Sequence, residues 1–227
     1  MRLNKYISLC GITSRRKADN LILQEKIKIN DKIINNFNSI VKKNDKVSYC
    51  NRIIYPNQYV YILINKPKNC IVTNIDDKSR NTIMDLIKDK EITNNLHAVG
   101  RLDRNTTGLI LLTNNGNLTY NLTHPSKNIL KIYSVKLNNI CNEYDINKIK
   151  QYKINNRIII DKLQYDRFKN EFTVTIHSGQ NRIIHRIFNY FGFKILKLDR
   201  IQYHNLNKQS LKRGQWKYIS YNDIYPI

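Results

Sequence analysis

The sequence predicts an α+β protein in which a small N-terminal domain precedes a larger domain built mainly on antiparallel sheet. Residues 1–48 show two short helical patterns followed by short alternating strands. Residues 49–58 are polar and interrupted by Pro56, as in a linker, and residues 59–227 contain mostly strand patterns with a few helices. We therefore expect two domains, at residues 1–48 and 59–227, joined by this linker.

The first domain begins with two helices. Apolar side chains recur at helical spacing from Leu3, and Gly11 is expected to end this first helix. Ser14 can cap a second helix, because its hydroxyl can accept a backbone N–H of the first turn. Strand patterns follow at residues 27–30 and 41–47.

The larger domain alternates strand and helix patterns without an internal repeat. We expect strands at residues 61–64, 109–112, 131–137, 157–163, 172–176 and 194–201. We expect helices at residues 82–87, 117–123, 144–152 and 181–190. This order of elements is typical of an α+β domain.

The charge of the chain points to a polyanionic partner. Lys and Arg number 39 against 17 Asp and Glu, which gives a formal net charge of +22. Ile, Asn, Lys and Tyr together make 110 of the 227 residues, a bias typical of an AT-rich genome, so some lysines are discounted. The same bias does not explain why there are only four glutamates, and a preference for nucleic acid remains.

Several classes of function lack their sequence signals. No apolar run reaches the roughly 18 residues of a membrane span, and no apolar stretch follows the first charged residues as in a secretion signal. The four cysteines are at least twenty residues apart, which favours a reducing cytoplasm over a zinc or disulfide framework. The five histidines lack metal-ligand spacing, and neither G-x-x-x-x-G-K-[ST] nor G-x-G-x-x-G occurs. We therefore expect no metal, no nucleotide cofactor and no membrane partner.

Residues 100–116 carry the clearest chemical pattern. One acid, Asp103, stands between Arg101 and Arg104 in a glycine-bounded loop that leads directly into an apolar strand. The neighbouring cations favour the ionised carboxylate, which can serve as a nucleophile or stabilise a developing positive centre. The alternative is a turn residue with Arg101 as its surface partner.

The same loop resembles the G-R-L-D signature of pseudouridine synthases, in particular the bacterial RsuA/RluB-like family that acts on ribosomal RNA. Other segments match the motifs of this family in the expected order. They are residues 64–67, 131–135 with a lysine-x-tyrosine pattern, 177–188 with the arginine-bearing pattern, 194–200, and 211–216 with a closing L-x-x-G-x-W pattern. The resemblance spans nearly the whole chain.

The N-terminal region has a resemblance of its own. Residues 3–7, 11–18 and 27–30 resemble the alpha-L RNA-binding motif, first known from a small-subunit ribosomal protein. Members of that group usually carry glycine where Glu25 and Asp31 stand, so the two turns are either strained or differently built.

The family resemblance implies roles for four residues at the reacting base. Asp103 would be the essential carboxylate, Arg182 would pair with it, and Leu198 would form an apolar wall of the uracil pocket. Tyr133 would lie against the flipped uracil and help to remove a proton, and stacking is the favoured half of that role because a tyrosine with its usual pKa near 10 is a poor base at neutral pH. The structural alternatives are core strand positions for Tyr133 and Leu198 and a solvated cation for Arg182.

Contact with RNA is expected from a further set of cations. They are Arg15, Arg16 and Lys17 at the start of the second helix, and Lys66, Arg101, Arg104 and Arg186 in the larger domain.

We therefore expect a monomeric, cytoplasmic, cofactor-independent pseudouridine synthase that acts on ribosomal RNA. The segment at residues 123–126 favours the large-subunit enzymes. The alternative is a non-catalytic RNA-binding factor of ribosome assembly, since Gln180, Ile183 and His185 replace residues that are commonly arginine, glutamine and arginine. A methyltransferase is disfavoured because the glycine-rich loop is missing. Asn69 stands where the family usually has glycine.

Overall fold

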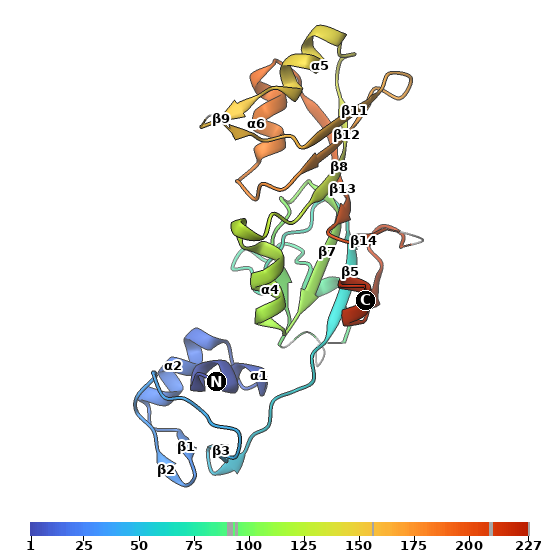
Figure 1. Ribbon diagram of the computed structural model, residues 1–227. Coiled ribbons are helices and arrows are strands. Elements are labelled where there is room, and N and C mark those ends of the chain that lie inside the picture. Colours follow the sequence, from blue (N-terminus) through green and yellow to red (C-terminus); the bar gives the residue numbers. More distant parts are fainter. Residues whose placement is uncertain (90–92, 94, 156, 209–210, 227) are drawn as a thin grey trace. The chain divides into compact units, whose positions relative to one another are not determined.

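The computed structural model describes residues 1–89, 93, 95–155, 157–208 and 211–226 (Figure 1). The chain folds into two compact units. The first comprises Met1–Val60 together with Asp89–Leu96, and the second comprises Tyr61–Lys88 together with His97–Ile227. None of the described helices has the length and apolarity needed to cross a membrane.

The first unit packs two helices on a small antiparallel sheet. The helices are α1 (Leu3–Leu9) and α2 (Arg15–Leu23), and the strands β1 (Ile27–Ile29), β2 (Lys32–Ile33), β3 (Val47–Tyr49) and β4 (Arg52–Ile53) are ordered β2-β1-β3-β4. Ser14 caps α2, since its hydroxyl accepts the backbone N–H of Lys17 at 3.4 Å. A core of its own holds the unit together, with Leu3, Ile7 and Ile22 fully buried.

The predicted linker is partly folded. Arg52 and Ile53 form β4, which pairs with β3, and the next residue, Ile54, is buried in the core of the first unit. Polar composition and Pro56 suggested a free segment, but the turn at Cys50 and Asn51 returns the chain alongside β3, where it forms one further edge strand. The linker prediction for residues 49–58 is therefore wrong at its N-terminal half.

Two turns of the first unit are strained, as one of the two sequence alternatives expected. Glu25 and Asp31 have φ angles of 57° and 65°, in the left-handed region that favours glycine. Glu25 follows the end of α2, where its N–H binds the Ile22 carbonyl and the Lys26 N–H binds the Leu21 carbonyl. These two bonds make a Schellman motif with glutamate at the position that usually takes glycine.

Replacing Glu25 with glycine is therefore expected to stabilise the protein by about 1 kcal/mol, because the left-handed conformation disfavours a side chain. Urea unfolding, followed at the transition of the first unit, measures the change in the free energy of unfolding. Glu25→Ala is the matched control, since it removes the carboxylate but keeps a Cβ. An equal gain from Glu25→Ala would attribute the effect to charge and contradict the strain argument.

The second unit is built on one large mixed sheet with the strand order β11-β12-β8-β13-β7-β5-β15. The strands are β5 (Tyr61–Lys66), β6 (His97–Val99), β7 (Thr107–Thr113), β8 (Lys131–Leu137), β11 (Lys162–Asp166), β12 (Glu171–Ile176), β13 (Ile195–Tyr203), β14 (Leu206–Asn207) and β15 (Trp216–Tyr218). A separate two-stranded ribbon contains β9 (Lys153–Ile154) and β10 (Arg157–Ile158). All neighbours along this order are antiparallel except β13 and β7, and the predicted fold class is confirmed.

Helices pack on the sheet and form two hydrophobic core clusters with it. The helical elements are η1 (Met84–Leu86), α4 (Gly116–Thr123), η2 (Pro125–Lys127), α5 (Glu143–Lys150), α6 (Ile183–Tyr190) and α7 (Tyr221–Ile224). One cluster packs α5 and α6 against β8, β12 and β13, and the other packs α4 against β7. The apolar side of α6, which includes Ile184, Ile187 and Phe188, is buried in the first cluster.

Two predicted elements of the second unit differ from the structure, and in the first unit the strand expected at residues 41–47 differs as well, since only Val47 lies in a strand, β3. Residues 157–163 form no single strand, because β10 pairs with β9 while β11 pairs with β12. Ile159 and Ile160 between these ladders are buried in the core, so an apolar run that resembled one strand serves as a packed connection. The helix predicted at residues 82–87 is only the short 3₁₀ turn η1.

A close backbone approach joins the two halves of the large sheet. The parallel pairing of β13 with β7 involves only Asp199 with Thr107 and Arg200 with Gly108. Gly108 has a φ of 111°, and a Cβ on it would lie 2.3 Å from the carbonyl oxygen of Arg200. Only glycine therefore permits this contact, which brings the loop before β7 next to the middle of β13.

Candidate active site

A cavity of about 440 Å³ lies within the second unit. Most of its lining comes from four segments: the loop between β6 and β7, strand β8, the loop before α6 with the first turn of that helix, and strand β13. Asp103, Tyr133, Arg182 and Leu198, the four residues expected at the reacting base, all line this cavity. The fold thus brings together side chains that lie up to 95 positions apart in the sequence.

Asp103 and Arg182 form a long, open ion pair. Nε of Arg182 lies 3.9 Å from Oδ2 of Asp103, with the two side chains 59% and 46% exposed. A pair as open as this contributes little to stability, and the carboxylate stays accessible from the cavity. Arg182 has a φ of 48° just before α6, and backbone strain of this kind is typical of functional sites.

Two lysines, one fully buried and one partly buried, anchor the loops that carry this pair. Nζ of Lys66 donates to the carbonyls of Pro67, Cys70 and Arg104 at 3.1, 2.6 and 3.1 Å, which ties down the loop of Asp103. Nζ of Lys131 donates to the carbonyls of Ile129, His177 and Ser178 at 3.2, 2.9 and 3.5 Å, next to the loop of Arg182. Burial lowers the pKa of each lysine to about 8.

Tyr133 and Leu198 form a wall of the cavity. They are 8% and 7% exposed, and both also belong to the core cluster under α6. Tyr133 stands opposite Arg200 across the ladder of β8 and β13. The functional and structural interpretations of these residues are therefore compatible, since each packs in the core and presents one edge to the cavity.

His185 lines the same cavity from the first turn of α6. Burial lowers the pKa of its imidazole, the positive charge of Arg182 lowers it further, and Asp103 opposes both effects. His185 and the two other departures from the family's arginine-bearing pattern, Gln180 and Ile183, thus all line the site.

The expected RNA-binding cations fall into three groups. Arg101 and Arg104 are exposed and line the cavity, while Arg186 is exposed on α6 and lies outside the cavity lining. Arg15, Arg16 and Lys17 are exposed in the first turn of α2. Lys66 is fully buried and its ammonium is bound by three carbonyls, so it is not placed to contact RNA, contrary to expectation.

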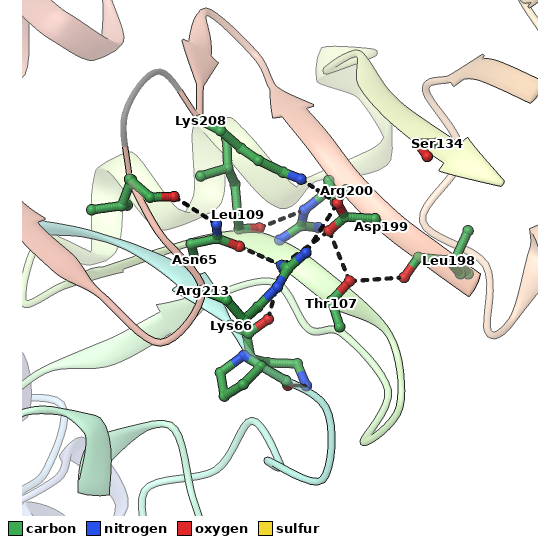
Figure 2. Close-up of polar contacts among 12 residues, drawn as sticks. Asn65, Lys66, Thr107, Leu109, Ser134, Leu198, Asp199, Arg200, Lys208 and Arg213 are labelled. Atoms are coloured by element: carbon green, nitrogen blue, oxygen red, sulfur yellow. Dashed lines mark hydrogen bonds and ion pairs between the residues drawn. The ribbon is translucent and has the colours of Figure 1, made fainter. Parts of the chain in front are cut away.

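A polar network centres on Asp199 (Figure 2), whose side chain faces away from the cavity because it alternates along β13 with the lining residues Leu198 and Arg200. Asp199 is 3% exposed and accepts from both Nη atoms of Arg213 at 3.1 Å, from Thr107 at 2.8 Å and from Lys208. Arg213 also donates to Asn65. The network ties the segment before β15 to β5, β7 and β13 at the level where Leu198 and Arg200 face the cavity.

Sequence reasoning missed the contributions of Arg200, Tyr203 and the Asp199 network. Arg200 is 2% exposed and lines the cavity, as does Tyr203, whose pKa burial raises to about 12. One signal was present: in a strand, Leu198 and Arg200 share a face, so a wall residue at 198 places a cation at 200 beside it.

Comparisons with known proteins identify the family of the chain. The family model described as RNA pseudouridylate synthase matches residues 60–190, and the S4 domain model matches residues 1–47. The chain is 32% identical over 233 residues to ribosomal large subunit pseudouridine synthase B of Bacillus subtilis, with 98% of this chain and 93% of that protein covered. Its identity to dual-specificity RNA pseudouridine synthase RluF of Salmonella typhi is also 32%, with 100% and 78% covered.

A solved structure entitled as a crystal structure of pseudouridylate synthase superposes with a TM-score of 0.69 at 26% identity, covering 99% of this chain and 98% of that one. The fold and the site therefore define an RNA pseudouridine synthase with an N-terminal S4 RNA-binding domain. Within that class the chain belongs to the RsuA/RluB-like family. The resemblance inferred from the sequence motifs is confirmed.

Proposed function

We propose that this protein isomerises uridine to pseudouridine at a defined position of large-subunit ribosomal RNA, as a cytoplasmic monomer without a metal or organic cofactor. The observation that carries the proposal is the single cavity lined by Asp103, Tyr133, Arg182 and Leu198. The names of relatives matched over 98% of the chain, in Bacillus subtilis and in Buchnera aphidicola, support the large ribosomal subunit as the source of the substrate.

The reaction moves a bond and is redox-neutral. The bond between uracil N1 and ribose C1′ breaks, the base rotates, and a bond forms between C5 and C1′ while a proton leaves C5 and N1 gains one. Asp103 supplies the carboxylate, which either attacks C1′ or assists elimination to a glycal, and both routes need it ionised. Arg182 orients that carboxylate, and Tyr133 and Leu198 hold the uracil ring.

The target nucleotide must leave its stack before it can react, at a cost of a few kcal/mol. Arg101 and Arg104 are exposed at the cavity and can hold phosphates on either side of a flipped nucleotide. In the S4 domain, Arg15, Arg16 and Lys17 present three cations at a helix start, where the helix dipole opposes them and an external anion compensates.

Mapping of pseudouridine in ribosomal RNA from cells with and without the protein tests the proposal. The expected result is loss of one or a few pseudouridines from large-subunit RNA, restored by the wild-type gene and by purified protein on unmodified RNA. Tight RNA binding with no loss of pseudouridine would instead support the non-catalytic assembly factor.

RNA binding is expected to depend steeply on salt. If about five phosphates are neutralised, log K should fall against log salt with a slope of roughly −3.5 to −4.5. Replacing Arg15, Arg16 and Lys17 by alanine should flatten this slope by about 2 to 3 and weaken binding to intact ribosomal RNA. Filter binding between low and moderate salt measures both effects.

The matched control for that variant is alanine at Lys26, Lys28 and Lys32, three other lysines of the same domain. Equal losses in the two triple variants would indicate general charge attraction only. A slope near zero for the wild type would contradict a polyanionic partner altogether.

A further inference from the structure

Arg200 is a buried cation with one guanidinium nitrogen, Nη2, that has no hydrogen-bond partner among the described residues. Its side chain is enclosed in the protein, Nε donates to the carbonyl of Leu109 at 2.7 Å, and Cζ lies 4.6 Å from the ring centroid of Tyr203. Within the part of the chain that the structure describes, Nη2 is shielded from solvent and has no hydrogen-bond partner. Buried charged groups almost always have partners, so an unused donor here indicates that something outside the chain supplies one.

The carboxylates near Arg200 are bound elsewhere. Asp199 precedes it on β13, but its side chain points to the opposite face, where Arg213 and Lys208 bind it (Figure 2). Asp103 pairs with Arg182. Two other cations, Lys66 and Lys131, are close enough to Arg200 that its charge contributes to lowering the pKa of each, after the larger effect of burial. This end of the cavity therefore has an excess of positive charge.

The reaction creates a negative charge on the uracil ring, which an excess of positive charge in the cavity can stabilise. When the N1–C1′ bond breaks, its electron pair stays on the uracil ring and spreads over the carbonyl oxygens O2 and O4. The ring is neutral before this step, so a cation that binds a carbonyl oxygen binds the transition state more strongly than the substrate. Arg200 stands opposite Tyr133 and shares the cavity wall with Leu198, the two residues proposed to hold that ring.

We propose that the guanidinium of Arg200 donates to a uracil carbonyl oxygen and stabilises the negative charge which that oxygen gains as the glycosidic bond breaks. The proposal rests on the proposed function and names the group that activates the leaving base. A phosphodiester is the other oxygen anion that RNA offers, but its charge is present from the start. A phosphate ligand would therefore make Arg200 a determinant of RNA affinity, whereas a uracil ligand makes it a determinant of the chemical rate.

A double-substitution cycle tests this contact. RNA oligonucleotides carry uridine, 2-thiouridine or 4-thiouridine at the position that the wild type modifies. In each thiouridine one carbonyl oxygen is replaced by sulfur, which is a poorer hydrogen-bond acceptor. Single-turnover rates and RNA dissociation constants are measured for the full-length wild type, Arg200→Met and Arg200→Lys. Arg200→Met is expected to lower the rate about 100-fold with the dissociation constant changed by less than about threefold.

The second expectation is non-additivity. One thio substitution slows the wild type but has no further effect on Arg200→Met, because the donor that it disturbs is already gone. Arg213→Met is the matched control: it removes another partly buried arginine that contacts β13 on the opposite face and should leave the thio effect at its wild-type size. If Arg200→Met does not fold, Arg200→Lys carries the test: lysine keeps the charge but moves the donor, so the thio effect should be smaller than in the wild type.

Three results would overturn the assignment. They are additive effects with both thio substrates, no thio effect on the wild type, and a loss confined to the dissociation constant. The last of these would assign Arg200 to a phosphate. A wild type that forms no pseudouridine in any ribosomal RNA would be a failure of the proposed function, and the two failures are therefore distinguishable.

Discussion

Replacing Asp103 with asparagine is expected to lower pseudouridine formation by about a thousandfold or more, to below detection, while RNA binding and thermal stability stay near those of the wild type. Asparagine keeps the size of the side chain but removes the charge that attack on C1′ or assistance to elimination requires. The turn itself does not depend on the carboxylate, because the Thr106 N–H binds the backbone carbonyl of Asp103 at 3.1 Å.

This substitution separates the catalytic role from the structural alternative. A residue needed only for the turn would tolerate asparagine, which favours turns as aspartate does. The open ion pair with Arg182 also predicts little change in stability, since both side chains are about half exposed. Measurable turnover by a pure, well-folded Asp103→Asn protein would return Asp103 to its structural role.

Arg182→Lys completes the test of the pair. Lysine keeps the positive charge near the carboxylate but lacks the planar, five-donor guanidinium that can hold it in one orientation. We expect a loss of activity smaller than that of Asp103→Asn but still clear in single-turnover assays. Full activity of Arg182→Lys would show that only its charge matters at this position.

Replacing Asp199 with alanine is expected to lower the free energy of unfolding by about 3 kcal/mol, because it leaves Arg213 and Lys208 without their buried partner. The figure is at the low end for such networks, since the side chains of Arg213 and Lys208 are 36% and 23% exposed and retain some contact with water. Urea unfolding measures the loss. Asp166→Ala is the matched control, because Asp166 forms an exposed pair with Lys169 and its loss should cost far less stability than the loss of Asp199.

The contribution of Asp199 should also depend on pH in a defined direction. Burial alone would raise the pKa of this carboxyl, but the hydrogen bonds from Arg213, Lys208 and Thr107 outweigh burial and lower it overall. A lowered pKa in the folded state means that the stabilisation is complete above the unfolded value of about 3.9 and is lost as the pH falls below it. The difference in stability between wild type and Asp199→Ala should therefore shrink below about pH 4. Equal losses for Asp199→Ala and Asp166→Ala at neutral pH would contradict the argument.

The sequence by itself determined the two-domain α+β organisation, most of the elements and the acid of the site. Strand β8 occupies the predicted residues 131–137, and α4 and α6 begin within two residues of their predicted starts. These features depend on local side-chain periodicity, capping residues and a motif whose members are adjacent in the chain, and all of them can be read without knowing the fold.

Which cations are exposed and which are buried in the protein interior depends on the tertiary fold. Lys66 and Arg104 look alike in the sequence, yet Lys66 is fully buried and Arg104 is exposed at the cavity. The position of Tyr203 depends on an irregularity of β13 between Arg200 and Gln202, which reverses the alternation of faces. Strict alternation from Leu198 would place Tyr203 on the opposite face, but the bulge directs it into the cavity beside Arg200. Strand register and bulges are set by packing between distant segments, so the local pattern of side chains cannot reveal them.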